Sequence, residues 1–223
     1  MSGREIILGF DMALSNSAAI SIDGKILSPT SSKNSPSRPS AMMKIIDSLL
    51  EEVDASPDQI SALTMNIGPG SFTGIRVGIA TAKGLAIPFN TPLIPFTSFE
   101  MIASINPDYK DGGIIINAGG GYFYFHASCE SKNGNISSRA SLLKTDEVIA
   151  KVDKLSTILL YGNKLDETGR NFKEMFPDKN IISENKDMAA LLCVAAGVAF
   201  KNNEFLKPVE LKPFYVKPSY VNL

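Results

Sequence analysis

The sequence predicts an α/β fold of two lobes, each a mixed β-sheet with helices packed on it. The chain has 223 residues, 44% of them hydrophobic, so it is long enough and apolar enough for two small cores. Its hydrophobic periodicity predicts the element order β-β-β-α-β-α-β-α, and the same order then begins again. We therefore expect two lobes of similar architecture, at residues 1–104 and 105–223.

The first lobe is expected to open with three antiparallel strands. Apolar runs flank Asp23-Gly24, a dipeptide that favours the tight turn of a hairpin. Apolar residues at helical spacing then begin at Ser40 and recur after a further apolar run. The predicted elements are strands 5–11, 18–22 and 25–28, a helix from residue 40, strand 60–67, helix 73–86, strand 93–96, and a helix that Thr97 or Ser98 caps.

The second lobe is expected to repeat this order. We predict a turn at Asp111-Gly112-Gly113 and a hairpin at Asn133-Gly134. Three prolines between residues 208 and 223, with aromatic residues among them, predict an extended tail that its rings anchor on the surface. The other predicted elements are strands 114–117, 122–129 and 136–139, helix 145–152, strand 157–161, helix 165–176, strand 181–182 and helix 187–202.

Charge and composition exclude several classes of function. With 22 basic and 23 acidic residues the chain has no overall field that would attract nucleic acid, so any RNA contact should be local or come through a partner. No apolar run approaches the length of a membrane span, and no secretory leader is apparent, so we expect a soluble cytoplasmic protein. Cys129 and Cys193 lie far apart in apolar contexts and are expected to be reduced packing residues.

The most distinctive segment is MNIGPGSFTGIRVGIATAKGLA, residues 65–86. It fails as a Walker loop, because Gly74 is followed by Ile75 and Arg76 where lysine and a hydroxyl are required. It fails as a dinucleotide fingerprint, because its third glycine comes one place late. A strand, a turn and a helix N-terminus remain, and they could attract an anion through backbone amides. The residues of this possible anion site are Gly68, Pro69, Gly70, Ser71, Phe72 and Thr73.

The helix that follows carries small residues at intervals of four. Gly74, Gly78 and Ala82 lie along one side of it, while Ile75 and Ile79 lie on another and are expected to face the sheet. A row of small residues lets another helix approach closely. That helix could belong to a partner, or the row could serve close packing within the chain, and the pattern alone leaves both open.

These residues carry a resemblance to a known family. The runs GPGSFTGIRVG (68–78) and AKGLA (82–86) resemble the signature of the TsaB (YeaZ) family. Further similar features are the first strand ending in Asp11, the helix start Thr97-Ser98-Phe99-Glu100, and PFYVK (213–217), whereas the second half is otherwise loosely matched. The resemblance implies two lobes of the actin-like ATPase (ASKHA) superfold. It also implies a role in making N6-threonylcarbamoyladenosine (t6A) at position 37 of tRNAs that read ANN codons.

In that family TsaB is a non-catalytic partner of the transferase TsaD, and the ATPase TsaE joins the complex. The resemblance thus implies a TsaD heterodimer, with tRNA met only through the complex and no cofactor or metal of its own. The chain departs from the family pattern in three places. Asp11-Met12-Ala13-Leu14 replaces Asp-Thr-Ser or Asp-Thr-Ala, Ser37-Arg38-Pro39-Ser40 replaces an Arg-x-x-His-like stretch, and Asn117-Ala118-Gly119 replaces an Asp-Ala-Arg type sequence.

Enzymatic alternatives find little support in the residues. An actin-like ATPase would need glycine and threonine after Asp11, and the chain has Met12 and Ala13 there. The only histidine, His126, lies in an apolar strand and is expected to be structural, which also disfavours a TsaD-like metal site and a serine protease. An independent nucleotide-hydrolysing enzyme using residues 68–74 remains the alternative.

The leading hypothesis is an assembly subunit that binds and activates TsaD through two helices of its first lobe. Methionine and small residues suit an adaptable helical interface. The same surface could form a homodimer when the partner is absent. The predicted interface residues are Met42, Ile45, Ile46, Leu49, Gly74, Arg76, Gly78 and Ala82.

Overall fold

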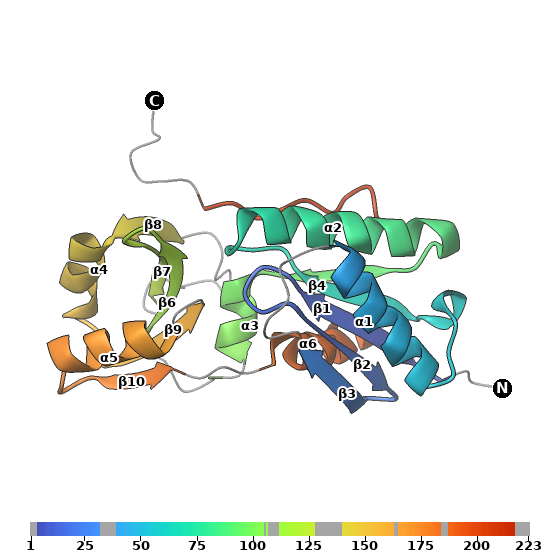
Figure 1. The fold of residues 1–223 in the computed structure, drawn as a ribbon, viewed down its shortest axis with the longest axis horizontal. Helices are drawn as coiled ribbons and strands as arrows, with labels where there is room; N and C mark the ends of the chain where they lie inside the picture. The colour runs from blue at the N-terminus through green and yellow to red at the C-terminus, as the bar shows by residue number, and fades with distance from the viewer. Residues whose placement is uncertain are drawn as a thin grey trace. The chain divides into compact units, whose positions relative to one another are not determined.

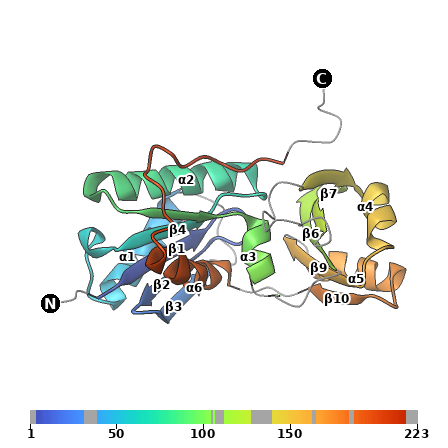
Figure 2. The same cartoon turned by 180° about the vertical axis from the view of Figure 1, so that it is seen from behind.

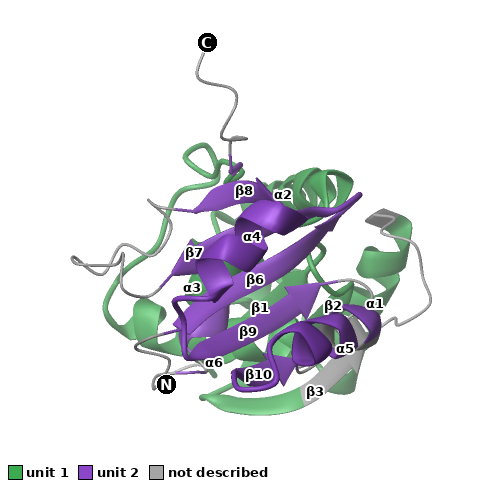
Figure 3. Cartoon of the chain, turned by 90° about the vertical axis from the view of Figure 1, so that its left-hand side faces the viewer, with its two compact units in different colours: residues 1–101, 187–214 green, residues 102–186, 215–223 purple. Residues whose placement is uncertain are grey.

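A computed structural model describes residues 4–31, 39–104, 106, 112–127, 140–162, 165–183 and 187–216. The chain forms two compact units (Figure 3), the first from residues 1–101 and 187–214, the second from residues 102–186 and 215–223. The predicted element order β-β-β-α-β-α-β-α occurs twice and is confirmed. Each unit holds one five-stranded mixed sheet. The two-lobe α/β fold predicted from the sequence is therefore correct.

The first unit is built on a sheet of strand order β3-β2-β1-β4-β5 (Figure 1). The pairs β1–β2 and β2–β3 are antiparallel, and β1–β4 and β4–β5 are parallel. The strands are β1 (Ile6–Asp11), β2 (Ser17–Ile22), β3 (Lys25–Ser31), β4 (Ala62–Asn66) and β5 (Leu93–Phe96). The helices are α1 (Pro39–Glu52), α2 (Phe72–Ala86) and α6 (Met188–Lys201), with 3-10 turns at Pro57–Gln59 and Ile87–Phe89. Helix α3 (Ser98–Ser104) begins in this unit and ends in the second.

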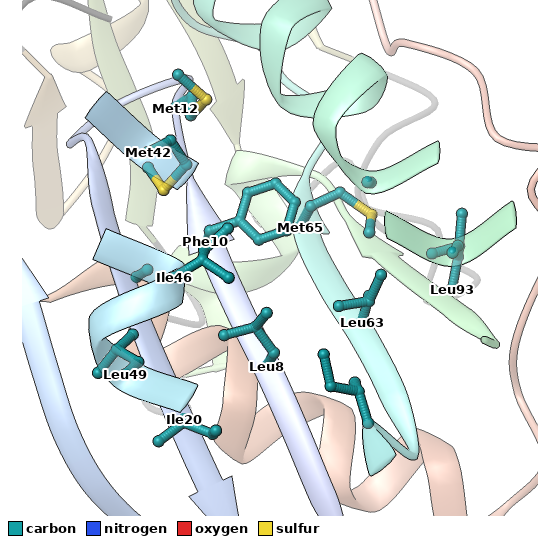
Figure 4. Close-up of a cluster of buried hydrophobic side chains, with 14 of the residues drawn as sticks. Leu8, Phe10, Met12, Ile20, Met42, Ile46, Leu49, Leu63, Met65 and Leu93 are labelled. Carbon is teal, nitrogen blue, oxygen red and sulfur yellow. The ribbon is translucent and has the colours of Figure 1, made fainter. Parts of the chain in front are cut away.

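Helices cover both faces of this sheet, so its central strand is buried on both sides. Alternate residues of β1 point to opposite faces. Leu8 and Phe10 lie beside residues of α1 in Figure 4 and share one core with residues of α2. Ile7 packs with residues of α6 on the other face. A strand covered in this way is expected to be apolar throughout, which explains the continuous run of β1.

Helix α6 packs on the first sheet, although it follows the second unit in the chain (Figure 2). The sequence predicted a boundary after residue 104 with all later residues in the second lobe. Residues 187–214 instead group with the first unit. The reason is that Ala189, Cys193 and Ala196 of α6 fill the face of the sheet that α1 and α2 leave open.

The second unit is built on a sheet of strand order β10-β9-β6-β7-β8. Its core gathers side chains such as Phe125, Leu160 and Phe172, and Phe172 meets Phe123 edge to face at 5.9 Å. The strands are β6 (Gly112–Gly119), β7 (Tyr122–Ala127), β8 (Ser141–Lys144), β9 (Thr157–Gly162) and β10 (Asn180–Ser183). The helices are α4 (Thr145–Val152) and α5 (Leu165–Met175).

Two turns of the second unit differ from expectation. The predicted turn at Asp111-Gly112-Gly113 is wrong for its glycines, because Gly112 and Gly113 pair with β9 inside strand β6. The actual reversal between β6 and β7 uses Gly119–Gly121, whose φ angles of 83°, 61° and 78° suit glycine. The next strand that the structure describes is β8. The predicted strand 136–139, the Asn133-Gly134 hairpin and Cys129 lie outside the described residues.

The tail is extended, as predicted, but an aliphatic residue anchors it. Leu206 forms an antiparallel bridge with Leu93 of the edge strand β5, and the Phe214 amide donates to the Ile67 carbonyl at 2.8 Å. Between these points Leu211 is 1% exposed and belongs to the core, whereas Tyr215 is exposed. In the described part of the tail one leucine and backbone hydrogen bonds hold it, Phe214 is half-buried, and Tyr220 lies outside the described residues.

Candidate partner-binding surface

The glycine-rich loop between β4 and α2 is tied to three other segments of the first unit. The Ser71 amide donates to the Ala13 carbonyl of the β1–β2 turn at 2.8 Å. The Ser98 amide, at the start of α3, donates to the Gly68 carbonyl at 2.8 Å. The tail joins next to the loop, at Ile67. The loop is therefore a junction of the fold.

Hydrogen bonds of two buried side chains, Asn66 and Ser98, also hold the glycine-rich loop in place. The Asn66 amide nitrogen donates to Ser98 Oγ at 2.9 Å, and Asn66 Oδ1 accepts from the Gly68 amide at 2.9 Å. Ser98 Oγ in turn lies 2.7 Å from the Pro69 carbonyl, to which it can donate. Both side chains are buried, so these bonds satisfy polar groups that would otherwise be costly to enclose.

The glycines of the loop are required by close backbone contacts. At Gly68, whose φ is 111°, a Cβ would lie 2.6 Å from the Phe214 carbonyl oxygen. At Gly70 a Cβ would lie 2.5 Å from the Ala13 carbonyl oxygen, and at Gly74 it would overlap the Met12 carbonyl oxygen. Packing within the chain therefore accounts for these glycines.

The predicted anion site at residues 68–73 stays a prediction. Gly68 and Pro69 are buried, whereas Ser71, Phe72 and Thr73 are exposed at the start of α2. Ser71 is the N-cap of α2, and its hydroxyl accepts from the Gly74 amide at 3.1 Å. The Ser71 hydroxyl is thus already used in capping α2.

Burial corrects the predicted interface residues on both helices. Met42, Ile46 and Leu49 point into the first core (Figure 4), because α1 packs on the sheet through them. The row Gly74, Gly78 and Ala82 is also buried, since the β1–β2 turn crosses it at Met12. Of the two alternatives for this row, close packing within the chain is the correct one. Only Ile45, which is half-buried, and Arg76, which is exposed, retain a surface position.

The outward side of α2 instead presents a different set of residues. Arg76, Ala80 and Gly84 are exposed, and Val77, Thr81 and Leu85 are half-buried. With Met43 of α1 these residues line a shallow depression of about 560 Å³, which we call the α1/α2 groove. The Arg76 guanidinium lies 3.9 Å from the centre of the Phe72 ring, a cation–π contact at the end of the groove. The surface residues of α2 therefore differ from the small-residue row that the sequence pattern singled out.

The β1–β2 turn, where an actin-like ATPase would hold phosphate, is occupied by a side chain of the protein. The carboxylate of Asp11 is fully buried and accepts from the amides of Ala13, Leu14 and Ser15 at 2.7–3.3 Å. It also accepts from Ser15 Oγ at 2.7 Å. The backbone amides of this turn therefore already donate hydrogen bonds to a carboxylate of the chain itself.

The other candidate residues from the sequence lie inside the fold. His126 is buried in β7 and Cys193 is buried in α6. Burial raises the pKa of the Cys193 thiol to about 12. Among the described residues no three His, Cys, Asp or Glu side chains come together as a metal site, and none of the described helices is long and apolar enough to cross a membrane.

Comparison with known proteins gives the family. A family model described as TsaD, tRNA N6-adenosine threonylcarbamoyltransferase, matches residues 35–175, more than half of the chain. TsaB of Bacillus subtilis, a tRNA threonylcarbamoyladenosine biosynthesis protein, is 37% identical over 84 residues. A tRNA N6-adenosine threonylcarbamoyltransferase of Clostridium perfringens is 26% identical over 192 residues. These matches cover 37% and 81% of this chain, but 36% of the first relative and 56% of the second.

Solved structures show the fold over nearly the whole chain. YeaZ from Pseudomonas aeruginosa superposes with a TM-score of 0.71 at 19% identity, covering 95% of this chain and 100% of YeaZ. Component A of the (R)-2-hydroxyglutaryl-CoA dehydratase of Acidaminococcus fermentans follows with a TM-score of 0.52 at 11% identity, covering 90% of this chain and 99% of its own. The fold is that of the two-lobe actin-like ATPases. The chain belongs to the family that the TsaD model describes, and within it the TsaB (YeaZ) assignment made from the sequence is confirmed.

Proposed function

We propose that this chain is a non-catalytic assembly subunit of the machinery that makes t6A at position 37 of tRNA. It binds and activates the transferase TsaD through the α1/α2 groove, TsaE joins the complex in the cytoplasm, and tRNA is met only through that complex. The names of its TsaB relatives support the pathway. The observation that carries the proposal is the apolar, small-residue outward side of α2.

Gly84 supports a helix as the occupant of the groove. It lies exposed inside α2, and a Cβ built on it would meet no atom within 4 Å. Glycine inside an exposed helix costs about 1 kcal/mol relative to alanine, and no neighbour within the described part of the chain requires glycine here. With Ala80 one turn before it, Gly84 leaves room for a second helix to approach α2 closely. Met43 and Leu85 supply apolar walls that adapt to the partner's side chains.

The same groove also suits a second copy of the chain, since a surface that accepts a related helix can accept an identical one. We propose that this homodimer forms when TsaD is absent and dissociates when TsaD binds. The two assemblies then compete, because both need Ala80 and Gly84 uncovered.

The alternative function, an independent ATPase, is disfavoured by the occupied β1–β2 turn. An incoming phosphate would have to displace the Asp11 carboxylate from three backbone amides, and the two anions would repel each other. Calorimetry with ATP and ADP, together with a hydrolysis assay on the isolated chain, tests this. Tight binding with turnover would establish the enzyme and refute the subunit.

Docking is tested by filling the groove. Ala80→Leu and Gly84→Leu each add an exposed side chain to α2 without entering the core, so the fold is expected to remain intact. Both should abolish co-purification with TsaD of the same organism and fail to restore t6A in cells depleted of the native chain. Ala150→Leu, the same enlargement on the exposed side of α4, is the matched control and should do neither. If both groove variants bind TsaD as the control does, the proposal is wrong.

A further inference from the structure

We propose that the outward face of α6 is a self-association surface, on which a second copy of this chain packs its own α6 in antiparallel orientation. Helix α6 covers the face of the first sheet opposite to α1 and α2 (Figure 2). The surface is therefore separate from the α1/α2 groove, and the inference does not rest on the proposed function.

Helix α6 is apolar on the side that faces away from the sheet as well as on the side that faces it. The chain carries no charged residue between Asp187 and Lys201. Beyond the inward residues that pack on the sheet, Val194 is 59% exposed and Val198 is 64% exposed, and Leu191 beside them is half-buried. A helix that is apolar all round is ordinarily buried all round. The composition of α6 therefore suits a covered outward face, whereas Val194 and Val198 on that face are exposed.

The outward residues follow the spacing of a helix pair. Asp187, Leu191, Val194, Val198 and Lys201 succeed one another in steps of four, three, four and three residues. This is the seam along which two helices pack side by side. The three inner positions are apolar, and the two outer positions carry opposite charges.

Charge complementarity selects a second copy in antiparallel orientation as the occupant. In that arrangement Asp187 of each copy lies beside Lys201 of the other, and each helix end meets the oppositely charged end of its partner. A parallel pair would bring like charges together at both ends. The two-fold axis of the antiparallel pair passes through Val194, which then contacts its own symmetry mate.

Gly197 fits the same arrangement. Under a two-fold axis at position 194, Leu191 of one copy faces residue 197 of the other. Gly197 is half-buried, and a Cβ built on it would meet only Ile7, at 4.0 Å, which is ordinary contact. The fold of the chain therefore does not require glycine there, whereas an incoming leucine side chain gains room from it.

The pair is expected to be weak. A helix of 14 residues is about 21 Å long, and one such contact buries less than the roughly 1,200 Å² of a standard stable interface. Association should therefore appear only at high protein concentration.

Cysteine cross-linking tests the geometry. In a Cys129→Ser, Ala80→Leu background, which removes one native thiol and blocks the groove, Val194→Cys should give a disulfide-linked dimer under mild oxidation, because the two sulfurs meet across the axis. Val209→Cys, at a residue 80% exposed outside α6, is the control and should remain monomeric. Equal yields from the two variants, or no dimer from Val194→Cys, would overturn the proposal.

A charge cycle tests the orientation independently, by sedimentation equilibrium in the Ala80→Leu background. Lys201→Glu sets a glutamate beside Asp187 of the other copy and should weaken the dimer roughly three- to tenfold. Adding Asp187→Asn, which keeps the helix cap, should restore most of the loss. Lys207→Glu, an exposed lysine beyond the helix, is the control. If Lys201→Glu has no more effect than this control, the antiparallel pair is excluded, whatever the fate of TsaD binding.

Discussion

The Asp11 carboxylate accepts two hydrogen bonds from Ser15, one from its backbone amide and one from its hydroxyl, each at 2.7 Å. With the bonds from the two intervening amides, this pair closes the β1–β2 turn around a buried charge. The turn thereby holds Met12 and Ala13 against the glycine-rich loop and the start of α2.

Replacing Asp11 by alanine should destabilise the chain by about 2–4 kcal/mol, because three buried or half-buried amides and a hydroxyl would lose their acceptor. Urea unfolding followed by circular dichroism measures the change. Asp58→Ala removes a carboxylate that is exposed and bonded to the Ser56 hydroxyl, and it should cost less than about 1 kcal/mol. Equal losses in the two variants would show that the Asp11 hydrogen bonds are not what stabilises the turn.

Replacing Ser98 by alanine should cost about 1–3 kcal/mol. The change removes the hydroxyl that links the Asn66 side chain to the Pro69 carbonyl, and it leaves both in a buried site. Ser48→Ala is the control, since that hydroxyl is exposed on α1 and bonds only one turn back, to Lys44. Thermal unfolding of the two variants should separate them by several degrees.

Two glycines of the same helix should respond to alanine in opposite directions. Gly84→Ala should stabilise the chain by up to about 1 kcal/mol, because the new methyl group meets open space and the helix gains propensity. Gly74→Ala should destabilise it by more than about 2 kcal/mol, because the methyl group overlaps the Met12 carbonyl. Urea midpoints compare the two directly, and a shift of the same sign in both would contradict the packing described at Met12.

Leu211→Ala should cost about 2–5 kcal/mol, since this side chain of the tail is buried in the first core. Val209→Ala, two residues earlier and exposed, should change stability by less than about 0.5 kcal/mol. Proteolysis should also cut the Leu211→Ala tail sooner. A tail that is equally resistant in both variants would mean that Leu211 does not hold it in place.

Cys193 should make stability depend on pH in the alkaline range. Burial raises its pKa from 9.0 to about 12 in the folded chain, so the folded state keeps the thiol neutral where the unfolded chain ionises. The stability is therefore complete below pH 9 and falls as the pH rises from about 9 to 12. Cys193→Ala, in a Cys129→Ser background, should lose this component of the alkaline slope of the urea midpoint. In the same background, native Cys193 should resist a thiol-reactive dye until the chain unfolds.

Most of the fold was predictable from hydrophobic periodicity, because each strand and helix buries a face that local sequence must supply. Strand β1 reads as one apolar run and α4 as a capped amphipathic helix, and both lie where predicted. The turn at Gly119–Gly121 was missed although its three successive glycines were a usable signal. The short strand β8 (Ser141–Lys144) was not predicted, whereas the predicted strand 136–139 lies outside the described residues.

The candidate site was less predictable, for a reason that lies in helix geometry. In α2 the row Gly74, Gly78 and Ala82 neighbours the row of Ile75 and Ile79, and a helix on a sheet can bury both. Which row faces outward depends on the β1–β2 turn, which crosses α2 at Met12. That contact joins residues about 60 positions apart, and no local pattern encodes it. The sequence could likewise not show that α6 returns to the first sheet.

The return of α6 affects how the chain is completed on the ribosome. Residues 1–101 contain every strand of the first sheet, yet the helix that covers its second face begins at residue 188. At about 5–20 residues per second the intervening segment takes on the order of ten seconds to synthesise. During that time Ile7, Ala62 and Ile94 have no helix over them. The nascent first sheet thus leaves one apolar face uncovered until its last helix emerges.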